Sequence, residues 1–209
     1  MARARKNPAE THDRLSGVGA AAESVRIIGG EFRGRKLIYT GDLRTRPMKD
    51  RVREAVFNLI GTDAAGRQAI DLFAGTGALG LEALSRGATR ATFYEQHFPT
   101  ARVIRQNAAL LGVTERTLVE SGNVFLWVPH AKFEADQPWL VFCSPPYAFY
   151  LERQQDMLTL IGTLIDRAPS GSVFVVEYDA RFNSELLPKT VSWDVRQYMP
   201  AVIAIGRKP

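Results

Sequence analysis

A glycine-rich segment between two apolar stretches constrains the fold of this chain more than any other feature. Residues 67–95, RQAIDLFAGTGALGLEALSRGATRATFYE, place an apolar run before Gly75, Gly77 and Gly80 and apolar residues at helical spacing after them. This order predicts a buried strand, a glycine turn, a helix and a second strand that ends at Glu95. A glycine turn that opens a helix exposes backbone N–H groups and lets a ligand approach closely. The segment is therefore expected to bind a nucleoside cofactor, with Glu95 accepting hydrogen bonds from ribose hydroxyls.

Asp71 helps to distinguish between the cofactors that such a turn can bind. It lies inside the predicted strand, four residues before Gly75, where its charge would repel a pyrophosphate. S-adenosylmethionine has no phosphate and carries a sulfonium and an ammonium group, so an acid at this position favours it over a nicotinamide dinucleotide. Taken singly, Asp71 could cap the turn, the glycines could form an ordinary tight turn and Glu95 could be a solvated charge. Their joint spacing argues against all three alternatives together.

The composition of the chain indicates one α/β domain with an appendage. Its 209 residues, 45% of them hydrophobic, can bury one substantial core. The presence of a single cysteine, Cys143, excludes internal disulfides and fits a reducing cytoplasm. Because Cys143 ends an apolar strand, we expect it to pack in the core rather than act as a nucleophile. No apolar run approaches the ~20 residues of a membrane span, and the histidines have no spacing typical of a metal site. We expect a cytoplasmic monomer without a metal.

Positive charge is concentrated in the first quarter of the chain. Residues 1–53 hold 13 Lys and Arg against 6 Asp and Glu, a net charge of +7, whereas residues 54–209 carry −2. Such a distribution indicates either contact with a phosphate backbone or a solubilising surface. Residues 25–39 predict a basic β-hairpin around two glycines, and Arg51 and Arg53 are expected to project from the polar face of a helix over residues 48–60, toward RNA, cofactor or water. The candidate RNA-binding residues are Arg26, Arg33, Arg35, Lys36, Arg44, Arg46, Arg51 and Arg53.

The rest of the chain alternates helices and strands. Helices are predicted over 99–111 and 150–165, strands over 117–120, 139–143 and 172–178, and a closing antiparallel hairpin around Pro200. Together with the glycine-turn unit this pattern predicts a doubly wound, mostly parallel, seven-stranded α/β sheet, with its ligand crevice at the carboxyl ends of the strands. At the end of the third strand, Asn123 could hydrogen-bond the adenine and Val124 pack on it; a turn-forming Asn123 is the alternative.

A second special turn, Ser144-Pro145-Pro146-Tyr147, follows the apolar strand over 139–143 and should lie beside the glycine turn. Methyl transfer to an exocyclic amine needs hydrogen-bond acceptors for its N–H groups, because the nitrogen lone pair is delocalised into the base. Prolines donate no backbone hydrogen bond, so the neighbouring carbonyls are expected to be rigid, free acceptors. We expect Ser144 to be the side-chain acceptor and Tyr147 to stack on a flipped-out base. The alternative is a stiff surface turn.

Five segments in this order resemble those of the bacterial small-subunit rRNA guanine-N2 methyltransferases of the RsmD type: RIIGGEFRGRKL, RPMKDRVREAVFN, DLFAGTGALGLEALSRGA, YEQ and SPPY. The resemblance runs from Val25 nearly to the C-terminus. It implies a class I methyltransferase, Rossmann-like fold, S-adenosylmethionine as cofactor, and small-subunit rRNA or the 30S particle as partner. The family motif usually begins with Asp or Asn, where this chain has Ser144. The resemblance assigns cofactor binding to Asp71, Ala74, Gly75, Gly77 and Glu95.

The sequence thus predicts three parts: a disordered basic tail (1–24), a basic hairpin arm with a linker (25–47) and a methyltransferase domain (48–209). The expected activity is methyl transfer from S-adenosylmethionine to the N2 amine of a guanine in 16S rRNA. An adenine-N6 methyltransferase of DNA or RNA, a catalytically silent, cofactor-binding rRNA assembly factor and a nicotinamide oxidoreductase are the alternatives.

Overall fold

The computed structural model describes residues 25–39, 41 and 47–209. The predicted tail over 1–24 and the candidate residues Arg44 and Arg46 lie outside the described residues. The strands are β1 (Gln68–Asp71), β2 (Arg90–Glu95), β3 (Thr117–Ser121), β4 (Trp139–Cys143), β5 (Val173–Asp179), β6 (Ser192–Tyr198) and β7 (Ala201–Arg207). The helices are α1 (Asp50–Ile60), α2 (Ala78–Ser85), α3 (Phe98–Leu111), α4 (Val124–Trp127), α5 (Phe149–Glu152) and α6 (Gln154–Arg167), with short 3₁₀ turns at Thr114–Arg116, Val128–His130 and Ser184–Leu186.

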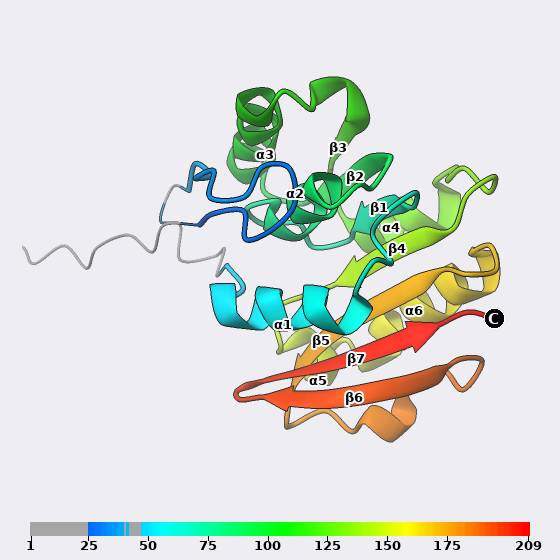
Figure 1. Cartoon of the computed structure of the whole chain (residues 1–209). Helices are drawn as coiled ribbons and strands as arrows, with labels where there is room; N and C mark the ends of the chain where they lie inside the picture. The colour runs from blue at the N-terminus through cyan, green and yellow to red at the C-terminus, as the bar shows by residue number, and fades with distance from the viewer. Residues whose placement is uncertain (1–24, 40, 42–46) are drawn as a thin grey trace, which may run out of the picture.

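The strands form one seven-stranded sheet in the order β3-β2-β1-β4-β5-β7-β6 (Figure 1). Neighbouring strands from β3 to β5 are parallel, and β7 runs antiparallel between β5 and β6. The predicted doubly wound, mostly parallel sheet is therefore confirmed. Because the strand order reverses between β1 and β4, the ligand crevice of such a sheet belongs at the carboxyl ends of these two strands.

Helices cover both faces of the sheet. The apolar sides of α1, α2 and α3 pack on one face, in a cluster that includes Phe57, Leu81 and Ile104. Helix α6 and the short α4 pack on the other face, where Ile161 contacts the opposite side of the strands (Figure 1). All four residues of β1 are buried, as expected for a strand covered on both faces. In the described part of the chain, no helix has the length and apolar character of a membrane span.

Residues 25–39 fold back on themselves, but over a shorter pairing than the predicted hairpin. One antiparallel bridge joins Arg26 and Lys36, and a turn over residues 29–34 separates them. Four apolar side chains of this segment are buried in the core, those of Val25, Ile27, Phe32 and Leu37, whereas Ile38 and the basic side chains are exposed. At Gly30, φ is +75° and an added Cβ would lie 1.9 Å from the carbonyl oxygen of Ser85, so only glycine allows this close approach.

Arg53 points into the body, which corrects its predicted RNA-binding role. It is completely buried; its guanidinium donates to the backbone carbonyl of Arg26 at 2.6 Å and to Asp50 at 2.9 Å, and its Nε lies 4.0 Å from Glu82. Glu82 is also fully buried and accepts two backbone N–H groups of the segment 25–39, each at 2.7 Å. Arg53 and Glu82 therefore attach this segment to α1 and α2, and the Arg53 side chain cannot reach RNA.

The predicted helix over 150–165 is two helices. The break lies at Arg153, whose φ of −133° and ψ of 34° are not helical. The guanidinium of Arg153 lies over the ring of Phe125, 3.9 Å from its centroid, and also pairs with Asp156. The short α5 carries Phe149 into the wall of the cavity described next.

Candidate active site

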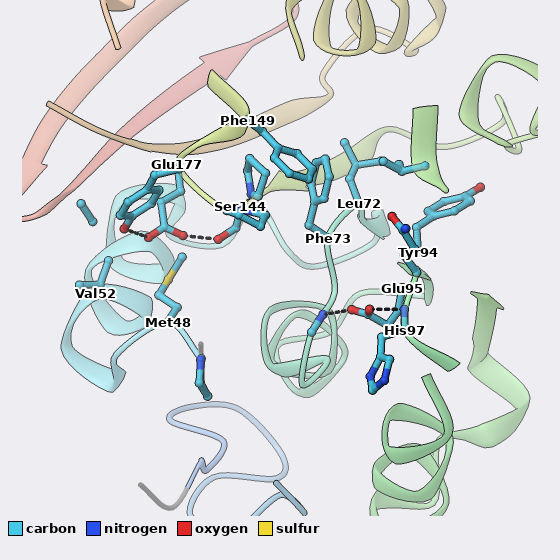
Figure 2. A pocket seen from close by; sticks show the side chains of 18 of the residues that line it. Met48, Val52, Leu72, Phe73, Tyr94, Glu95, His97, Ser144, Phe149 and Glu177 are labelled. Atoms are coloured by element: carbon cyan, nitrogen blue, oxygen red, sulfur yellow. Dashed lines mark hydrogen bonds between the residues drawn. The ribbon is translucent and has the colours of Figure 1, made fainter. Parts of the chain in front are cut away.

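A cavity of about 670 Å³ opens at the carboxyl ends of β1, β4 and β5 (Figure 2). This volume is within the range of roughly 300–1,000 Å³ typical of small-molecule sites. Its walls come from the glycine turn, the ends of β2 and β3, the turn over 144–147, the end of β5, the β6–β7 connection and the start of α1. The cavity therefore joins the two special turns, as the sheet topology predicts.

Glu95 stands at the end of the cavity where the sequence predicts the cofactor, and we call it the cofactor end. Its carboxylate accepts the backbone N–H of Gly75 at 2.9 Å and that of His97 at 2.7 Å (Figure 2). Burial raises the pKa of Glu95, and these hydrogen bonds oppose the rise. Each carboxylate oxygen retains a further lone pair. Glu95 can therefore still accept hydrogen bonds from the hydroxyls of a bound ligand.

The glycine turn shapes this end of the cavity mainly through its backbone. Gly75 and Gly77 have φ of +51° and +77°, and Gly75 lines the cavity. At Gly80 an added Cβ would lie 2.4 Å from the ring of Phe93, so glycine allows α2 to pack closely on β2. Asp71 lies beneath the turn, where its Oδ2 accepts the N–H of Gly80 at 3.2 Å.

Three of the predicted cofactor residues support the turn without lining the cavity. These are Asp71, Ala74 and Gly77. Asp71 is almost completely buried, and this burial raises its pKa to about 7. The sequence predicted that Asp71 would act on the cofactor, but its side chain accepts the backbone N–H of Gly80 in α2 and does not line the cavity.

Asn123 and Val124 line the cofactor end, and their contact with an adenine stays a prediction. The side-chain oxygen of Asn123 accepts the N–H of Phe125 at 3.0 Å and so caps α4, which is the turn-forming alternative. Sequence reasoning missed the aromatic wall beside it. Phe73, Phe125 and Phe149 pack against one another with ring centroids 6.0–6.2 Å apart and give the cavity an apolar side.

The other end of the cavity contains the turn Ser144 to Tyr147, where the sequence predicts the amine that accepts the methyl group. We call it the acceptor end. All four residues line it, together with Glu177 at the end of β5. Ser144 Oγ and the hydroxyl of Tyr147 both donate to the carboxylate of Glu177, the latter at 2.7 Å (Figure 2). Sequence reasoning missed Glu177. The available signal was an acid directly after the apolar run VFVV of this strand, where a buried charge needs a partner.

The backbone of this turn differs in part from the prediction. The carbonyl of Pro146 is not a free acceptor, because the N–H of Phe149 donates to it at 2.9 Å as α5 begins. This hydrogen bond occupies the carbonyl of Pro146 and not those of Ser144 and Pro145, which come earlier in the turn. Cys143 is buried, 3.7 Å from the hydroxyl of Tyr150, and burial raises its pKa to about 12. Its prediction as a core residue is confirmed.

The remaining basic candidates are exposed. They are Arg26, Arg33, Arg35, Lys36 and Arg51. Arg26 pairs with Asp50 at the start of α1, and Arg35 donates to the carbonyl of Leu110 at the end of α3. These two contacts hold the segment 25–39 against the body, beside the helix whose first turn lines the acceptor end.

Solved structures identify the class of this fold. An RNA methyltransferase from Salinibacter ruber, in complex with S-adenosyl-L-homocysteine, superposes with a TM-score of 0.56 at 16% identity, covering 78% of this chain and 94% of that one. A hypothetical protein from Thermus thermophilus superposes with a TM-score of 0.69 at 28% identity, covering 88% of this chain and 99% of that one. The fold is the Rossmann-like fold of methyltransferases.

The family follows from sequence similarity. The family model described as conserved hypothetical protein 95 matches residues 25–198. The ribosomal RNA small subunit methyltransferase D of Escherichia coli K12 is 39% identical over 149 residues, 69% of this chain and 71% of that protein. The protein of the same name from Haemophilus influenzae is 36% identical over 137 residues, 64% of this chain and 69% of that one. The chain belongs to this family, which confirms the RsmD-type resemblance.

Proposed function

We propose that this protein transfers a methyl group from S-adenosylmethionine to the exocyclic N2 amine of a guanine in small-subunit rRNA. The observation that carries the proposal is a single cavity with a glycine turn and Glu95 at one end and the Ser144–Tyr147–Glu177 cluster at the other. Membership of a family that includes proteins named ribosomal RNA small subunit methyltransferase D supports rRNA as the substrate. The protein would act as a monomer on naked 16S rRNA or on the 30S particle.

The cofactor end fits S-adenosylmethionine better than a dinucleotide. Glu95 would bind the ribose hydroxyls, Gly75 would allow close approach to the turn, and Asn123 and Val124 would flank the adenine. Among the described residues that line the cavity, Lys49 is the single lysine or arginine. This lining suits a ligand with positive rather than negative charge, because its two carboxylates, Glu95 and Glu177, outnumber that lysine. When bound, S-adenosylmethionine supplies an electrophilic methyl group attached to a sulfonium.

The acceptor end supplies what an exocyclic amine needs. One of its N–H groups would donate to Ser144 or to a carbonyl that precedes Pro146, which favours the nucleophilic form of the nitrogen as positive charge develops. The ring of Tyr147 would stack on the base, which must leave its helix to enter the cavity. Both hydroxyls of this cluster bind Glu177, so one carboxylate holds both residues in place.

The exposed basic side chains of the segment 25–39, together with Arg51, would contact the rRNA backbone. These side chains stand on a segment attached to α1, whose first turn lines the acceptor end. Phosphate contacts there would position the target nucleotide without reading its sequence. Arg53 is not included, because it is buried.

Incubation with cofactor labelled in its methyl group tests the proposal. The substrates are naked 16S rRNA and 30S particles that lack the modification, and the labelled nucleoside is identified by digestion and mass spectrometry. Label in N2-methylguanosine is the expected result. Label in N6-methyladenine of RNA or DNA would instead establish the adenine alternative, and cofactor binding without transfer to any ribosomal substrate would establish the silent assembly factor.

A further inference from the structure

The hydrogen bonds of Glu177 to the turn at the acceptor end do not use the full accepting capacity of its carboxylate. Its side chain is 6% exposed and lines the cavity, with Ser144 Oγ on one carboxylate oxygen and the hydroxyl of Tyr147 on the other (Figure 2). A carboxylate can accept about four hydrogen bonds. Each oxygen of Glu177 can therefore accept one more donor from a ligand in the cavity.

The walls next to Glu177 are suited to a flat base. Met48, just before α1, and Val52, in its first turn, contribute apolar side chains, and Figure 2 shows both on the same side of the cavity as Glu177. The end of β6 contributes Tyr198, and the connection to β7 contributes Pro200. A base inserted between such walls is desolvated, and an unpaired polar group on its edge is then costly. The polar group that faces this edge should therefore determine which base is accepted.

We propose that Glu177 selects guanine by accepting hydrogen bonds from its N1–H and N2–H groups. These two adjacent donors match the two oxygens of a carboxylate, whereas adenine presents a lone pair at N1 beside its amine. With an adenine amine at the turn, the Glu177 carboxylate would face that lone pair without a hydrogen between them. The inference rests on the proposed methyl transfer to guanine and adds the residue that reads the base.

A purely supporting role for Glu177 would have different consequences. If the carboxylate only positioned the hydroxyls of Ser144 and Tyr147, its loss would slow transfer to every base that carries an amine at the same place. If it reads the N1 position, its loss would change the preference between bases that differ there. 2-Aminopurine separates the two roles, since it keeps the N2 amine but has a lone pair at N1.

The experiment compares wild type with Glu177→Gln on 16S rRNA that carries guanine or 2-aminopurine at the target position. Single-turnover rates are measured at saturating cofactor, and the affinity for S-adenosylhomocysteine is measured by calorimetry. We expect wild type to prefer guanine by roughly 10- to 100-fold, the range of hydrogen bonds to a charged group. In Glu177→Gln the rate on guanine should fall by about that factor. The ratio of the rates on guanine and 2-aminopurine should lie within a few-fold of one, because the amide can donate to N1 of 2-aminopurine.

Asp179→Asn is the matched control. It makes the same change of carboxylate to amide in the same strand, outside the cavity lining, where Asp179 pairs with Arg181. It should keep the wild-type rate and preference, and both variants should bind S-adenosylhomocysteine like wild type.

Three results would contradict the inference. The first is a wild-type enzyme that methylates guanine and 2-aminopurine equally well. This result does not depend on the folding of any variant. The second is a Glu177→Gln protein with the wild-type rate and preference. The third is a slower Glu177→Gln protein with an unchanged preference, which would leave only the supporting role. Failure of wild type to methylate rRNA at all would be seen first and would overturn the proposed function itself.

Discussion

The two ends of the cavity each contain a carboxylate that accepts two hydrogen bonds, but the donors differ in kind. At the cofactor end Glu95 binds two backbone N–H groups, those of Gly75 and His97. At the acceptor end Glu177 binds two side-chain hydroxyls. A backbone donor persists whatever side chain occupies its position, whereas a hydroxyl is lost by one substitution. The position of the carboxylate at the cofactor end therefore depends on the backbone conformation. At the acceptor end it depends on the identity of a few side chains.

The two ends also differ in how the chain builds them. The main parts of the cofactor end come from one continuous stretch, β1 to the end of β2. The acceptor end combines the start of α1, the turn after β4, the end of β5 and the β6–β7 connection. Its geometry depends on the register of the whole sheet, including the antiparallel pairing of β5 with β7.

The largest expected effect concerns the carboxylate beneath the cofactor end. Burial raises the pKa of Asp71 from 3.8 to about 7. The folded protein therefore retains a proton that the unfolded chain releases, and the associated stability is complete below pH ~4 and lost as pH rises through ~7. Between these limits the free energy of unfolding should fall by an amount on the order of 4 kcal/mol.

Denaturant unfolding between about pH 4 and about pH 8 measures this effect. Asp71→Asn should remove most of the slope, because an amide does not titrate. Asp194→Asn, at an exposed position in β6, is the control and should leave the slope unchanged. A wild-type slope in Asp71→Asn would show that Asp71 is ionised throughout.

The second prediction concerns Glu95. Glu95→Ala removes the proposed ribose acceptor and leaves the N–H groups of Gly75 and His97 without their carboxylate. Affinity for S-adenosylhomocysteine, measured by calorimetry, should fall by about 2 kcal/mol, as for hydrogen bonds to a charged group. The single-turnover rate at saturating cofactor should change little. Glu115→Ala, at an exposed position before β3, is the control. If Glu95→Ala bound S-adenosylhomocysteine as tightly as wild type, Glu95 would not be a cofactor-binding residue.

The third prediction tests the side-chain donors of the acceptor end. Tyr147→Phe keeps the ring but removes a donor to Glu177, so the single-turnover rate should fall by about 1 kcal/mol of transition-state stabilisation. Cofactor affinity should not change. Tyr94→Phe is the matched control, because Tyr94 lines the cofactor end with its hydroxyl directed away from the cavity (Figure 2). An unchanged rate in Tyr147→Phe would mean that the two hydroxyls are not both needed to position Glu177.

The contrast between the two ends explains what could be predicted from the sequence. The glycine turn, the strand before it and Glu95 are close in sequence, and their spacing alone predicts a ligand site. The strands β4 and β5 were also predictable from their apolar runs. Glu177 was not assigned, because its role depends on β5 lying beside β4 so that Cys143 pairs with Val176, a register that no local pattern specifies.

Arg53 illustrates the same limit outside the cavity. Helical spacing placed it on the polar face of α1, where an arginine is ordinarily directed to solvent. Its burial depends on Glu82 from α2 and on the backbone of Arg26, which fold against α1 from other parts of the chain. A charge pattern within one helix cannot reveal a counter-charge that another helix supplies.

The smallest expected effect concerns the exposed basic side chains, whose loss should leave both ends of the cavity unchanged. Arg33 and Lys36 are exposed on the segment that Glu82 and Arg53 attach to the body. If they contact phosphates, Arg33→Ala and Lys36→Ala should each lower the slope of log affinity against log salt for rRNA by about one unit.

Because these side chains are outside the cavity lining, the two substitutions should weaken rRNA binding while the affinity for S-adenosylhomocysteine and the single-turnover rate at saturating rRNA stay as in wild type. Lys189→Ala, at an exposed position after β5, is the matched control for loss of one positive charge. The informative variable is the salt slope, since a general change in net charge would act equally at all three positions. An unaltered slope in the Arg33→Ala, Lys36→Ala double variant would assign this charge to solubility and leave RNA positioning to other residues.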